Sequence, residues 1–479
     1  MDASHRDVQT EDRRGKVSGT EKESAVSQKT VTPVSRRLMP RRRMASLGWA
    51  FVVLLALAAP VILLIRTGAL SGLPVLHVLS LATGMLALSL LVAAFLLPSR
   101  LRTLSTHLGI ERVLRVHRAL AIGTASIVIA HIVFALAHSS KGLALLDLRD
   151  APPRVWFAIT ATVALVAIVV LAWTRRRRRP RYEGWRLSHI ILANIVILAS
   201  AMHVWLLDDL VNNTAVLVWF ALLAVVIIGL WVYRWWWRPR RQRQNAYIID
   251  EIRQHPEGSA TLVLHADGHS GMPFRPGQFA FLKIGSSPHV FEEHPFTIAS
   301  AATEPWRKEF TIKALGDFSE LVAGMKAGRR VYLDGPHGSF TVDGLASEAI
   351  VLIAGGVGIT PMLSMVKTLA ERRDTRPVLL VVAGRTADDL LHRERLDGLV
   401  HDLDLDIVEV LEEPPESWDG EVGWLTGSML KRHLPVRRRR LRVDYFICGP
   451  GPMVAAVTRA LEGLGVRNSR IHTELFDVV

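Results

Sequence analysis

The sequence has little cysteine: among its 479 residues only Cys448 is one. A single thiol cannot form a disulfide within the chain, and it cannot complete a zinc or iron–sulfur cluster, which needs several thiolates. Acidic residues are also few, since 44 Asp and Glu stand against 58 Lys and Arg, a net charge of +14. A redox metal held by this chain alone must therefore use histidine.

Apolar residues, in contrast, are abundant. They make up 50% of the chain, which is too large a share for an ordinary soluble protein of this length. Six apolar stretches are long enough to cross the roughly 30 Å hydrocarbon layer of a bilayer. They cover residues 47–65, 73–97, 113–136, 154–173, 187–207 and 214–234. The basic residues lie in runs beside these stretches, so they indicate orientation in a membrane rather than binding of nucleic acid.

The connections between the apolar stretches alternate in charge. Arginines gather before the first stretch, in the second and fourth connections and after the sixth, whereas the fifth connection carries Asp208 and Asp209. The positive-inside rule places both ends of the chain in the cytoplasm, and the composition suggests a bacterial inner membrane. Residues 1–44 are polar and lack apolar periodicity, so we expect a disordered cytoplasmic tail before a transmembrane domain over residues 45–238.

Two of the apolar stretches carry a pair of histidines at the same interval. His117 and His131 are 14 residues apart, and so are His189 and His203. Fourteen residues of helix return to within about 40° of the starting face, roughly 21 Å further along. The charge pattern makes the two helices parallel, so His117 would face His189 and His131 would face His203. This arrangement predicts two haems with histidine on both axial positions.

From about residue 244 the composition is that of a soluble protein. Short β-type runs at 260–265, 278–284 and 309–315 predict an antiparallel β-barrel domain over residues 244–345. Strands then alternate with helices, which predicts an α/β domain with a parallel sheet over residues 346–479. The expected strands are at 349–354, 378–383, 406–411 and 445–448, and the expected helices at 361–372, 388–399 and 453–464. The fold class is a multi-domain membrane protein: an all-α six-helix transmembrane bundle, a β-barrel and an α/β domain.

A glycine-rich turn follows the first strand of the α/β domain. It contains Gly355, Gly356, Gly358, Thr360 and Pro361 and precedes a helix. Glycines allow the backbone to approach a diphosphate, and the helix N-terminus offers amide donors, with Thr360 as a further donor. The position of the turn between strand and helix predicts a dinucleotide site.

Further motifs occur in a fixed order in the soluble half: Arg275-Pro276-Gly277-Gln278-Phe279, His294-Pro295-Phe296-Thr297-Ile298, Gly316-Asp317-Phe318-Ser319, Cys448-Gly449-Pro450-Gly451-Pro452-Met453 and Glu474-Leu475-Phe476. In this order they resemble the motifs of ferredoxin-reductase-type flavoprotein modules. The resemblance implies that FAD is bound by Arg275, Gly277, Gln278, His294, Pro295, Phe296, Thr297, Gly316 and Ser319. It implies that the nicotinamide cofactor is bound by the glycine-rich turn with Gly449, Pro450 and Met453. Cys448 would lie near the site of hydride transfer and Phe476 would cover the flavin; for Cys448 the alternative is a small buried strand residue. Arg385 could bind the 2′-phosphate of NADPH, and the choice between NADPH and NADH stays open.

Together with the paired histidines, the whole chain resembles the ferric reductase and NADPH oxidase superfamily. The resemblance implies an NAD(P)H-dependent transmembrane oxidoreductase with FAD and two b-type haems, bound by His117, His131, His189 and His203. The expected acceptor is a ferric chelate or dioxygen outside the membrane, with no obligatory protein partner.

Several alternatives stay open. Some oxidases of this superfamily have a histidine where this chain has Ala135, and here the nearest one is His138, although Arg66 resembles an arginine that such enzymes place near the outer haem. The acceptor could also be a quinone or an extracytoplasmic protein. Arg118 and Arg186 could meet haem propionates or be ordinary interface arginines. A hypothesis from a different functional class is that the protein is a proton or metal transporter with a histidine relay and a redox-sensing module.

Overall fold

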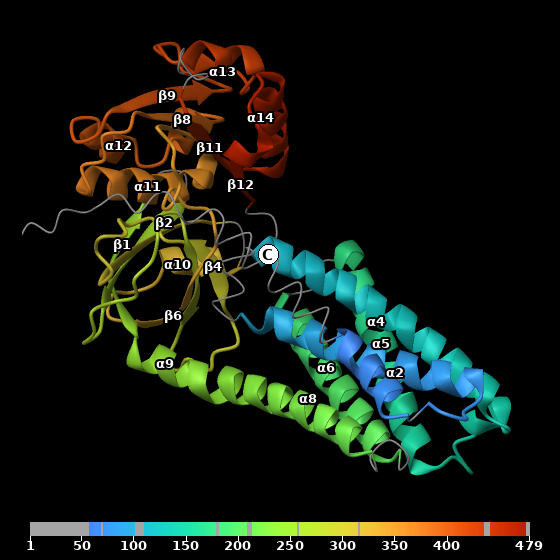
Figure 1. The fold of residues 1–479 in the computed structure, drawn as a ribbon. Helices are drawn as coiled ribbons and strands as arrows, with labels where there is room; N and C mark the ends of the chain where they lie inside the picture. The colour runs from blue at the N-terminus through green and yellow to red at the C-terminus, as the bar shows by residue number, and fades with distance from the viewer. Residues whose placement is uncertain are drawn as a thin grey trace, which may run out of the picture.

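A computed structural model describes most of the chain beyond the N-terminal segment. The described residues are 57–68, 70–100, 110–178, 182–207, 213–255, 258–314, 317–434 and 441–475. They form a long helical bundle joined to two β-sheet domains, which follow one another away from the bundle (Figure 1). The predicted tail over residues 1–44 lies outside the described residues.

Five helices among the described residues are long and apolar enough to cross a membrane. The helices of the bundle are α2 (Val75–Leu96), α4 (Ile110–His138), α5 (Pro153–Arg178), α6 (Tyr182–Trp205) and α8 (Thr214–Val232). A shorter apolar helix, Leu57–Arg66, precedes them. Most of the first predicted stretch, residues 47–65, lies outside the described residues, so the count of six spans stays a prediction. Short 3-10 helices, η1 (Leu97–Ser99) and η2 (Gly142–Leu146), follow α2 and α4.

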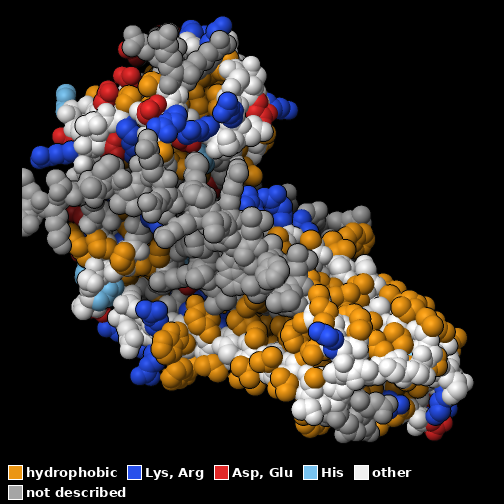
Figure 2. All heavy atoms as spheres, viewed as in Figure 1, with side chains coloured by type: hydrophobic (Ala, Val, Ile, Leu, Met, Phe, Trp, Pro, Cys, Tyr) orange, Lys and Arg blue, Asp and Glu red, His pale blue; other side chains and the backbone are white. Residues whose placement is uncertain are grey.

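The bundle exposes apolar side chains on its outer surface. Ile129, Val163 and Val225 are 64%, 63% and 66% exposed. Figure 2 shows hydrophobic side chains over much of the visible bundle surface, in contrast to the mixed surface of the sheet domains. Water would disfavour so much apolar area, whereas lipid chains accept it. The protein is an integral membrane protein.

The last bundle helix continues into the soluble part without a flexible linker. A π-helical turn, η3 (Tyr233–Trp237), and α9 (Arg238–Gln244) extend α8. Only Asn245 and Ala246 separate α9 from the first strand, β1 (Tyr247–Gln254). Ala246 is buried, and its carbonyl accepts hydrogen bonds from Asp267 N and His269 Nε2. The junction is therefore part of the folded domain that follows.

The first sheet is antiparallel, as predicted, with strand order β4-β3-β6-β1-β2-β5. Its strands are β1, β2 (Ser259–Ala266), β3 (Phe279–Ile284), β4 (His294–Thr297), β5 (Arg307–Lys313) and β6 (Arg330–His337), with helix α10 (Asp317–Ala323) between β5 and β6. Tyr247, Leu262, Phe310 and other apolar side chains fill its core. Closure of this sheet into a barrel stays a prediction.

The second sheet is parallel throughout, with strand order β10-β9-β8-β7-β11-β12. Its strands are β7 (Ala349–Gly355), β8 (Val378–Gly384), β9 (Leu405–Leu411), β10 (Glu421–Val422), β11 (Val443–Gly449) and β12 (Ile471–Leu475). Its helical elements are η4 (Gly356–Gly358), α11 (Ile359–Glu371), η5 (Ala387–Asp389), α12 (Arg393–Leu399), α13 (Gly427–His433), α14 (Gly451–Gly463) and η6 (Asn468–Arg470). The strand order reverses beside β7, between β7 and β11.

The predicted extent of one helix in this domain was wrong. Residues 388–399 were predicted as a single helix, but a 3-10 turn and the short helix α12 occupy them. His392 interrupts the helix because its φ of 64° is left-handed. Its ring is stacked edge-on against His255 at 5.1 Å, and its Nε2 lies 2.9 Å from the Thr311 hydroxyl. These contacts with the first sheet domain hold His392 away from a helical path.

The two sheet domains are joined by a buried carboxylate, Glu309 of β5. Lys367 Nζ of α11 and Arg395 Nη1 of α12 approach its Oε2 to 2.7 and 3.1 Å. Burial raises the pKa of Glu309, but the neighbouring cations outweigh burial and lower it to about 2. Glu309 is therefore ionised at neutral pH and fixes the second domain against the first.

Candidate functional site

The four histidines of the bundle form two pairs of facing rings. His117 of α4 and His189 of α6 have ring centroids 6.3 Å apart, and His131 and His203 have theirs 6.4 Å apart. The ring planes make angles of 71° and 74°. Both contacts can exist together only if α4 and α6 run in the same direction. The two helices thus carry two similar pairs at two depths of the bundle.

Three of these rings are oriented by a backbone carbonyl. His117 Nδ1 lies 2.9 Å from Ala94 O, His131 Nδ1 2.9 Å from Ser80 O, and His203 Nδ1 2.8 Å from Arg154 O. A carbonyl can only accept, so each Nδ1 carries the proton and each Nε2 keeps its lone pair. Hydrogen bonds of this kind fix histidines that bind a metal through Nε2. The two acceptors on α2, Ser80 and Ala94, are themselves 14 residues apart.

Helix α2 reaches the rings because Gly84 has no side chain. A Cβ atom added at Gly84 would lie 2.9 Å from Cε1 of His131. Such a distance is shorter than a normal van der Waals contact, so a larger residue would displace the ring. Gly84 therefore belongs to the wall of the pair formed by His131 and His203.

The fourth ring, His189, has different surroundings. Its Nδ1 is buried without a hydrogen-bond partner among the described residues, and its ring stacks on Trp185 at 5.3 Å. One turn earlier on the same helix, Arg186 contacts Glu293 of the first sheet domain and donates to Phe291 O at 3.3 Å. The guanidinium that could have met a haem propionate is thus engaged with protein groups.

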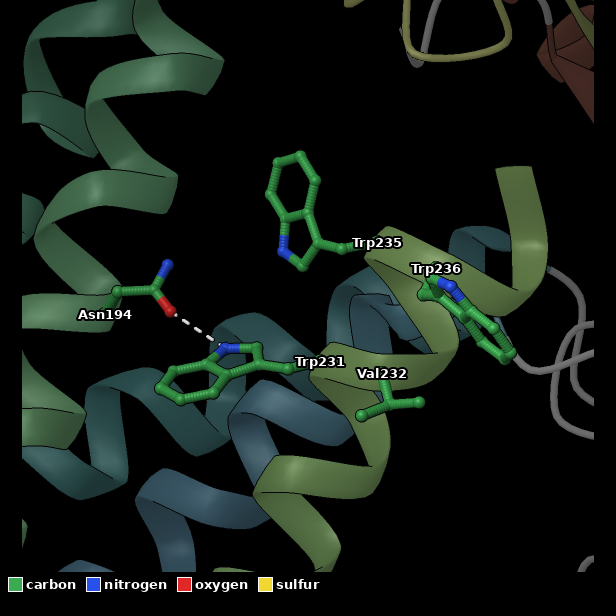
Figure 3. A pocket seen from close by; sticks show the side chains of 5 residues that line it. All are labelled: Asn194, Trp231, Val232, Trp235 and Trp236. Atoms are coloured by element: carbon green, nitrogen blue, oxygen red, sulfur yellow. Dashed lines mark hydrogen bonds between the residues drawn. The ribbon is translucent and has the colours of Figure 1, made fainter. Parts of the chain in front are cut away.

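A cavity of about 480 Å³ lies beside α6, away from the histidine pairs. Asn194 of α6 borders it, with Trp231 and Val232 of α8 and Trp235 and Trp236 of the π-helical turn. The Trp231 indole donates to Asn194 Oδ1 at 2.9 Å, and Trp235 extends toward α6 while Trp236 turns away (Figure 3). Five residues of helix place Asn194 about 140° around α6 from His189. The cavity is therefore separate from the facing rings.

The flavin motif of the first sheet domain forms strand β4, which pairs with β3. His294 stacks on Phe318 of α10 with centroids 4.1 Å apart, and Phe296 lies 6.0 Å from the same ring. Pro295 pairs in register with Phe281, and Thr297 with Phe279. Ser319 follows Phe318 in α10, so the structure brings it near the motif. Gly316 lies outside the described residues.

A turn before β3 contributes the next group of predicted residues. Arg275 and Gln278 close it, with Gln278 N donating to Arg275 O and Arg275 N donating to Gln278 Oε1 at 2.8 Å. Gly277 lies between them. Gln278 Nε2 also donates to Gly338 O at 2.9 Å, which ties the turn to the end of β6. The turn is therefore rigid and adjoins the strand that pairs with the flavin motif.

The predicted nicotinamide residues meet at the carboxyl ends of β7 and β11. A Cβ atom at Gly358 would lie 2.3 Å from Cys448 O, and one at Gly355 would lie 2.4 Å from Met453 Sδ. The turn starting at Gly355, with Gly356 and Pro361, thus packs directly on the turn of Gly449, Pro450 and Met453. This is the point where the strand order reverses, where open α/β sheets bind their ligands.

Two polar groups at this edge are already engaged. The Thr360 hydroxyl is buried and donates to Val357 O at 3.0 Å, so its hydrogen serves the turn itself rather than a ligand. Arg385, after β8, is exposed and its Nε contacts Glu413 Oε1 at 2.9 Å. Cys448, near the end of β11, is fully buried and pairs in register with Glu474 of β12. Burial and Glu474 raise the pKa of the Cys448 thiol, which stays protonated. Phe476 lies outside the described residues.

The chain matches three protein families in succession. Residues 83–200 match "Ferric reductase like transmembrane component", residues 256–341 match "FAD-binding domain", and residues 352–459 match "Oxidoreductase NAD-binding domain". The chain belongs to the ferric reductase and NADPH oxidase superfamily. An FAD-binding domain and an NAD-binding domain thus follow a ferric-reductase-like membrane domain in this chain.

Curated relatives match part of this chain. It is 35% identical over 201 residues to NADH-cytochrome b5 reductase 1 of Pyricularia oryzae, covering 41% of this chain and 64% of the relative. It is 30% identical over 295 residues to the protein of the same name from Aspergillus terreus, covering 57% of this chain and 98% of the relative. The chain thus spans a little under two thirds of the Pyricularia relative and nearly all of the Aspergillus terreus relative.

Solved structures are similar in part. The FAD/NAD-binding domain of nitric oxide dioxygenase from Vibrio cholerae is 22% identical, with a TM-score of 0.43, covering 48% of this chain and 98% of that one. A flavohemoglobin from Malassezia yamatoensis is 17% identical, with a TM-score of 0.44, covering 86% of this chain and 98% of that one.

Proposed function

We propose that this protein carries electrons from cytoplasmic NAD(P)H across the membrane to a small-molecule acceptor outside. A flavin can take a hydride and release single electrons, and two b-type haems can pass single electrons on, so these groups together supply the required chemistry when bound. His117 and His189 would hold the inner haem, and His131 and His203 the outer one. The protein's own task is to orient these groups and to exclude water from them.

The observation that carries this proposal is the geometry of the two histidine pairs. A metal–nitrogen bond of about 2 Å at each ring, and about 1.1 Å from each nitrogen to its ring centre, requires centroids about 6.2 Å apart. The observed separations are 6.3 and 6.4 Å. Histidine pairs that served only to fill the helix interface would not be expected to show this centroid separation in both places. The carbonyl partners of three rings also leave Nε2 with the lone pair that a metal requires.

In the soluble half, the residues around β4 would border FAD, and the turn starting at Gly355 would bind the nicotinamide cofactor. NADH is the donor that we favour. The relatives are named NADH-cytochrome b5 reductases, and Glu413 pairs with Arg385, so it weakens the attraction that this arginine offers to a 2′-phosphate. Phe476 would cover the flavin, and Cys448 would line the hydride path as a neutral thiol.

The orientation that we propose follows the charge pattern of the connections. The arginine-rich ends lie in the cytoplasm of a bacterium, together with both termini and the soluble domains. The His117 and His189 pair is then the inner one, on the side of the flavin. A ferric chelate or dioxygen would accept electrons near the outer pair, without an obligatory protein partner. A quinone or an extracytoplasmic protein is the alternative acceptor.

The test is anaerobic addition of NADH to the purified protein supplied with FAD, with the haem spectrum recorded throughout. We expect a low-spin haem spectrum that becomes reduced, and reoxidation when ferric citrate or air is added. Replacing His131 or His203 should leave flavin reduction intact and stop electron delivery outside. Absence of a haem spectrum would refute the proposal and favour a histidine relay. Cytochrome c reduction that superoxide dismutase suppresses would identify dioxygen as the acceptor.

A further inference from the structure

A cluster of charged side chains lies where the membrane bundle meets the first sheet domain. Its centre is Glu293, whose side chain is 1% exposed. Arg100, just after α2 and η1, reaches Glu293 Oε1 at 2.8 Å, and Arg186 of α6 contacts the same oxygen. Arg238, the first residue of α9, lies 3.5 Å from Oε2, and Lys283 of β3 lies 3.6 Å from it. Three arginines from three segments of the bundle thus converge on one carboxylate.

A second carboxylate reinforces the same contact. Asp334 of β6 is paired with Arg238, and Arg100 Nη1 lies 3.4 Å from its Oδ2. The Arg100 guanidinium also lies 3.5 Å from the centre of the Phe281 ring of β3. These groups are nearly all removed from water, so their attraction is little screened by salt.

Glu293 has to be ionised for this contact to form. Burial raises the pKa of its carboxyl group, but Arg100, Arg186, Arg238 and Lys283 outweigh burial and lower the pKa to about 2. A buried carboxylate with these partners is costly to disrupt, because removal of one side leaves uncompensated charge on the other. The contact is therefore a fixed feature of the protein near neutral pH.

The position of Glu293 in the chain connects this contact to both redox sites. Glu293 directly precedes His294, the first residue of the flavin motif. Arg186 precedes His189 by three residues on α6, so both lie on neighbouring positions of one helix face. The contact between Glu293 and Arg186 thus links the flavin motif to the inner histidine pair through one residue on one side and a single helical turn on the other.

We propose that Glu293 is a positioning residue that sets the separation between the flavin and the inner histidine pair. This inference rests on the proposed function. The ion-pair partners of Glu293 are cations that we do not assign to the nicotinamide site, so we expect its loss to leave hydride transfer from NADH to the flavin unchanged. It governs the next step, in which one electron leaves the reduced flavin and reduces a ferric haem to the ferrous state.

The test compares Glu293→Gln with wild type in the full-length protein loaded with FAD and haem. Stopped-flow spectroscopy follows flavin bleaching and haem reduction separately after mixing with NADH. We expect the same rate of flavin bleaching and a slowing of haem reduction by about tenfold, because a displaced flavin lengthens the distance that the electron must cross. Glu293→Asp should recover part of the rate. Glu251→Gln is the matched control, because Glu251 is an exposed carboxylate of the same domain whose ion pair is with Arg253 of its own strand.

A second measurement does not depend on activity. Hydrogen–deuterium exchange of residues 288–297 should rise in Glu293→Gln and stay at the wild-type level in Glu251→Gln. If Glu293→Gln does not fold, Arg100→Gln removes one cation of the cluster and should give the same changes at smaller size. In Arg186→Gln combined with Glu293→Gln, haem reduction should be no slower than in the slower single variant, because the two residues act as a unit.

Haem reduction and exchange at wild-type levels in Glu293→Gln would overturn the inference, and so would equal slowing of flavin bleaching and haem reduction. A wild-type protein without a haem spectrum would instead refute the proposed function. The exchange measurement would then still decide whether Glu293 holds the domains together.

Discussion

A single missing side chain decides how closely α2 approaches the outer histidine pair. Replacing Gly84 with alanine would place a Cβ atom 2.9 Å from Cε1 of His131 and force the ring or the helix to move. Overpacking of this kind costs about 1–3 kcal/mol, and we expect it to appear as loss of haem with a changed low-spin spectrum. Gly123→Ala on α4 is the control, since a Cβ atom there meets nothing within 4 Å. Equal haem content in the two variants would contradict the role of Gly84.

Glu293 predicts a defined pH dependence of stability. Its folded-state pKa of about 2 lies below the ordinary value of 4.5, so its stabilisation is complete above about pH 4.5 and is lost as the pH falls toward 2. The difference in thermal unfolding temperature between wild type and Glu293→Gln should therefore be constant from about pH 5 to 7, where Lys283, with a pKa lowered to about 8, is also charged, and shrink in more acidic buffer. A difference that grows on acidification would show that the carboxylate does not provide the stabilisation.

Substitutions of Arg385 and Glu413 should have opposite effects on the preference for NADPH over NADH. Glu413→Gln should free the Arg385 guanidinium and lower the KM for NADPH, whereas Arg385→Ala should raise it, by roughly tenfold for one charge-assisted contact. The KM for NADH should change little in either variant. A ratio of NADPH to NADH turnover that is unchanged in Arg385→Ala would remove the assignment.

At the scale of residues, sequence patterns predicted which histidines pair but not what orients them. The 14-residue interval is visible because histidine is rare in apolar stretches. Ser80 and Ala94 act through their carbonyls, which every residue has, so residue type carries no signal for them. Glu293 was equally hidden, since Glu292 beside it has the same chemistry and only the tertiary structure buries one of them and exposes the other.

At the scale of elements, the turn after β7 depends on its contact with the turn after β11. Gly358→Ala would place a Cβ atom 2.3 Å from Cys448 O, a backbone atom that cannot move aside. We expect a raised KM for NADH and a lower unfolding temperature, while the haem spectrum stays unchanged. Gly398→Ala in α12 is the control, because nothing lies within 4 Å of its Cβ position. An unchanged KM in Gly358→Ala would exclude the turn from nucleotide binding.

Strands with long apolar runs were predicted well, whereas β1, β4 and β6 were not predicted. β7, β8 and β11 are buried on both faces, so β7 and β8 are apolar throughout and β11 is apolar apart from Asp444. β1 and β6 contain charged residues at partly exposed positions, and β4 is short and begins with His-Pro. Such strands are defined by their partners in the sheet rather than by their own composition.

At the scale of the whole molecule, the order of the domains could be predicted because composition changes sharply near residue 244. The contact between bundle and sheet domain could not, since it joins residues far apart in the chain, such as Arg100 and Glu293. The helical extension from α8 through α9 was also unexpected, because the arginines after Trp237 suggested a membrane boundary and not a continuing helix.

That extension has a kinetic consequence. Many reductase modules on flexible tethers must diffuse to their electron acceptor, but here two residues separate α9 from β1 and the junction is hydrogen-bonded into the domain. Raising the solvent viscosity several-fold with sucrose should leave the rate of haem reduction by reduced flavin unchanged, as stopped-flow spectroscopy can measure. A rate that falls in proportion to viscosity would indicate a swinging domain. With a fixed junction, each electron would pass from the flavin to the haem without a diffusional encounter between domains. Turnover at saturating NADH would then not depend on how crowded the cytoplasm is.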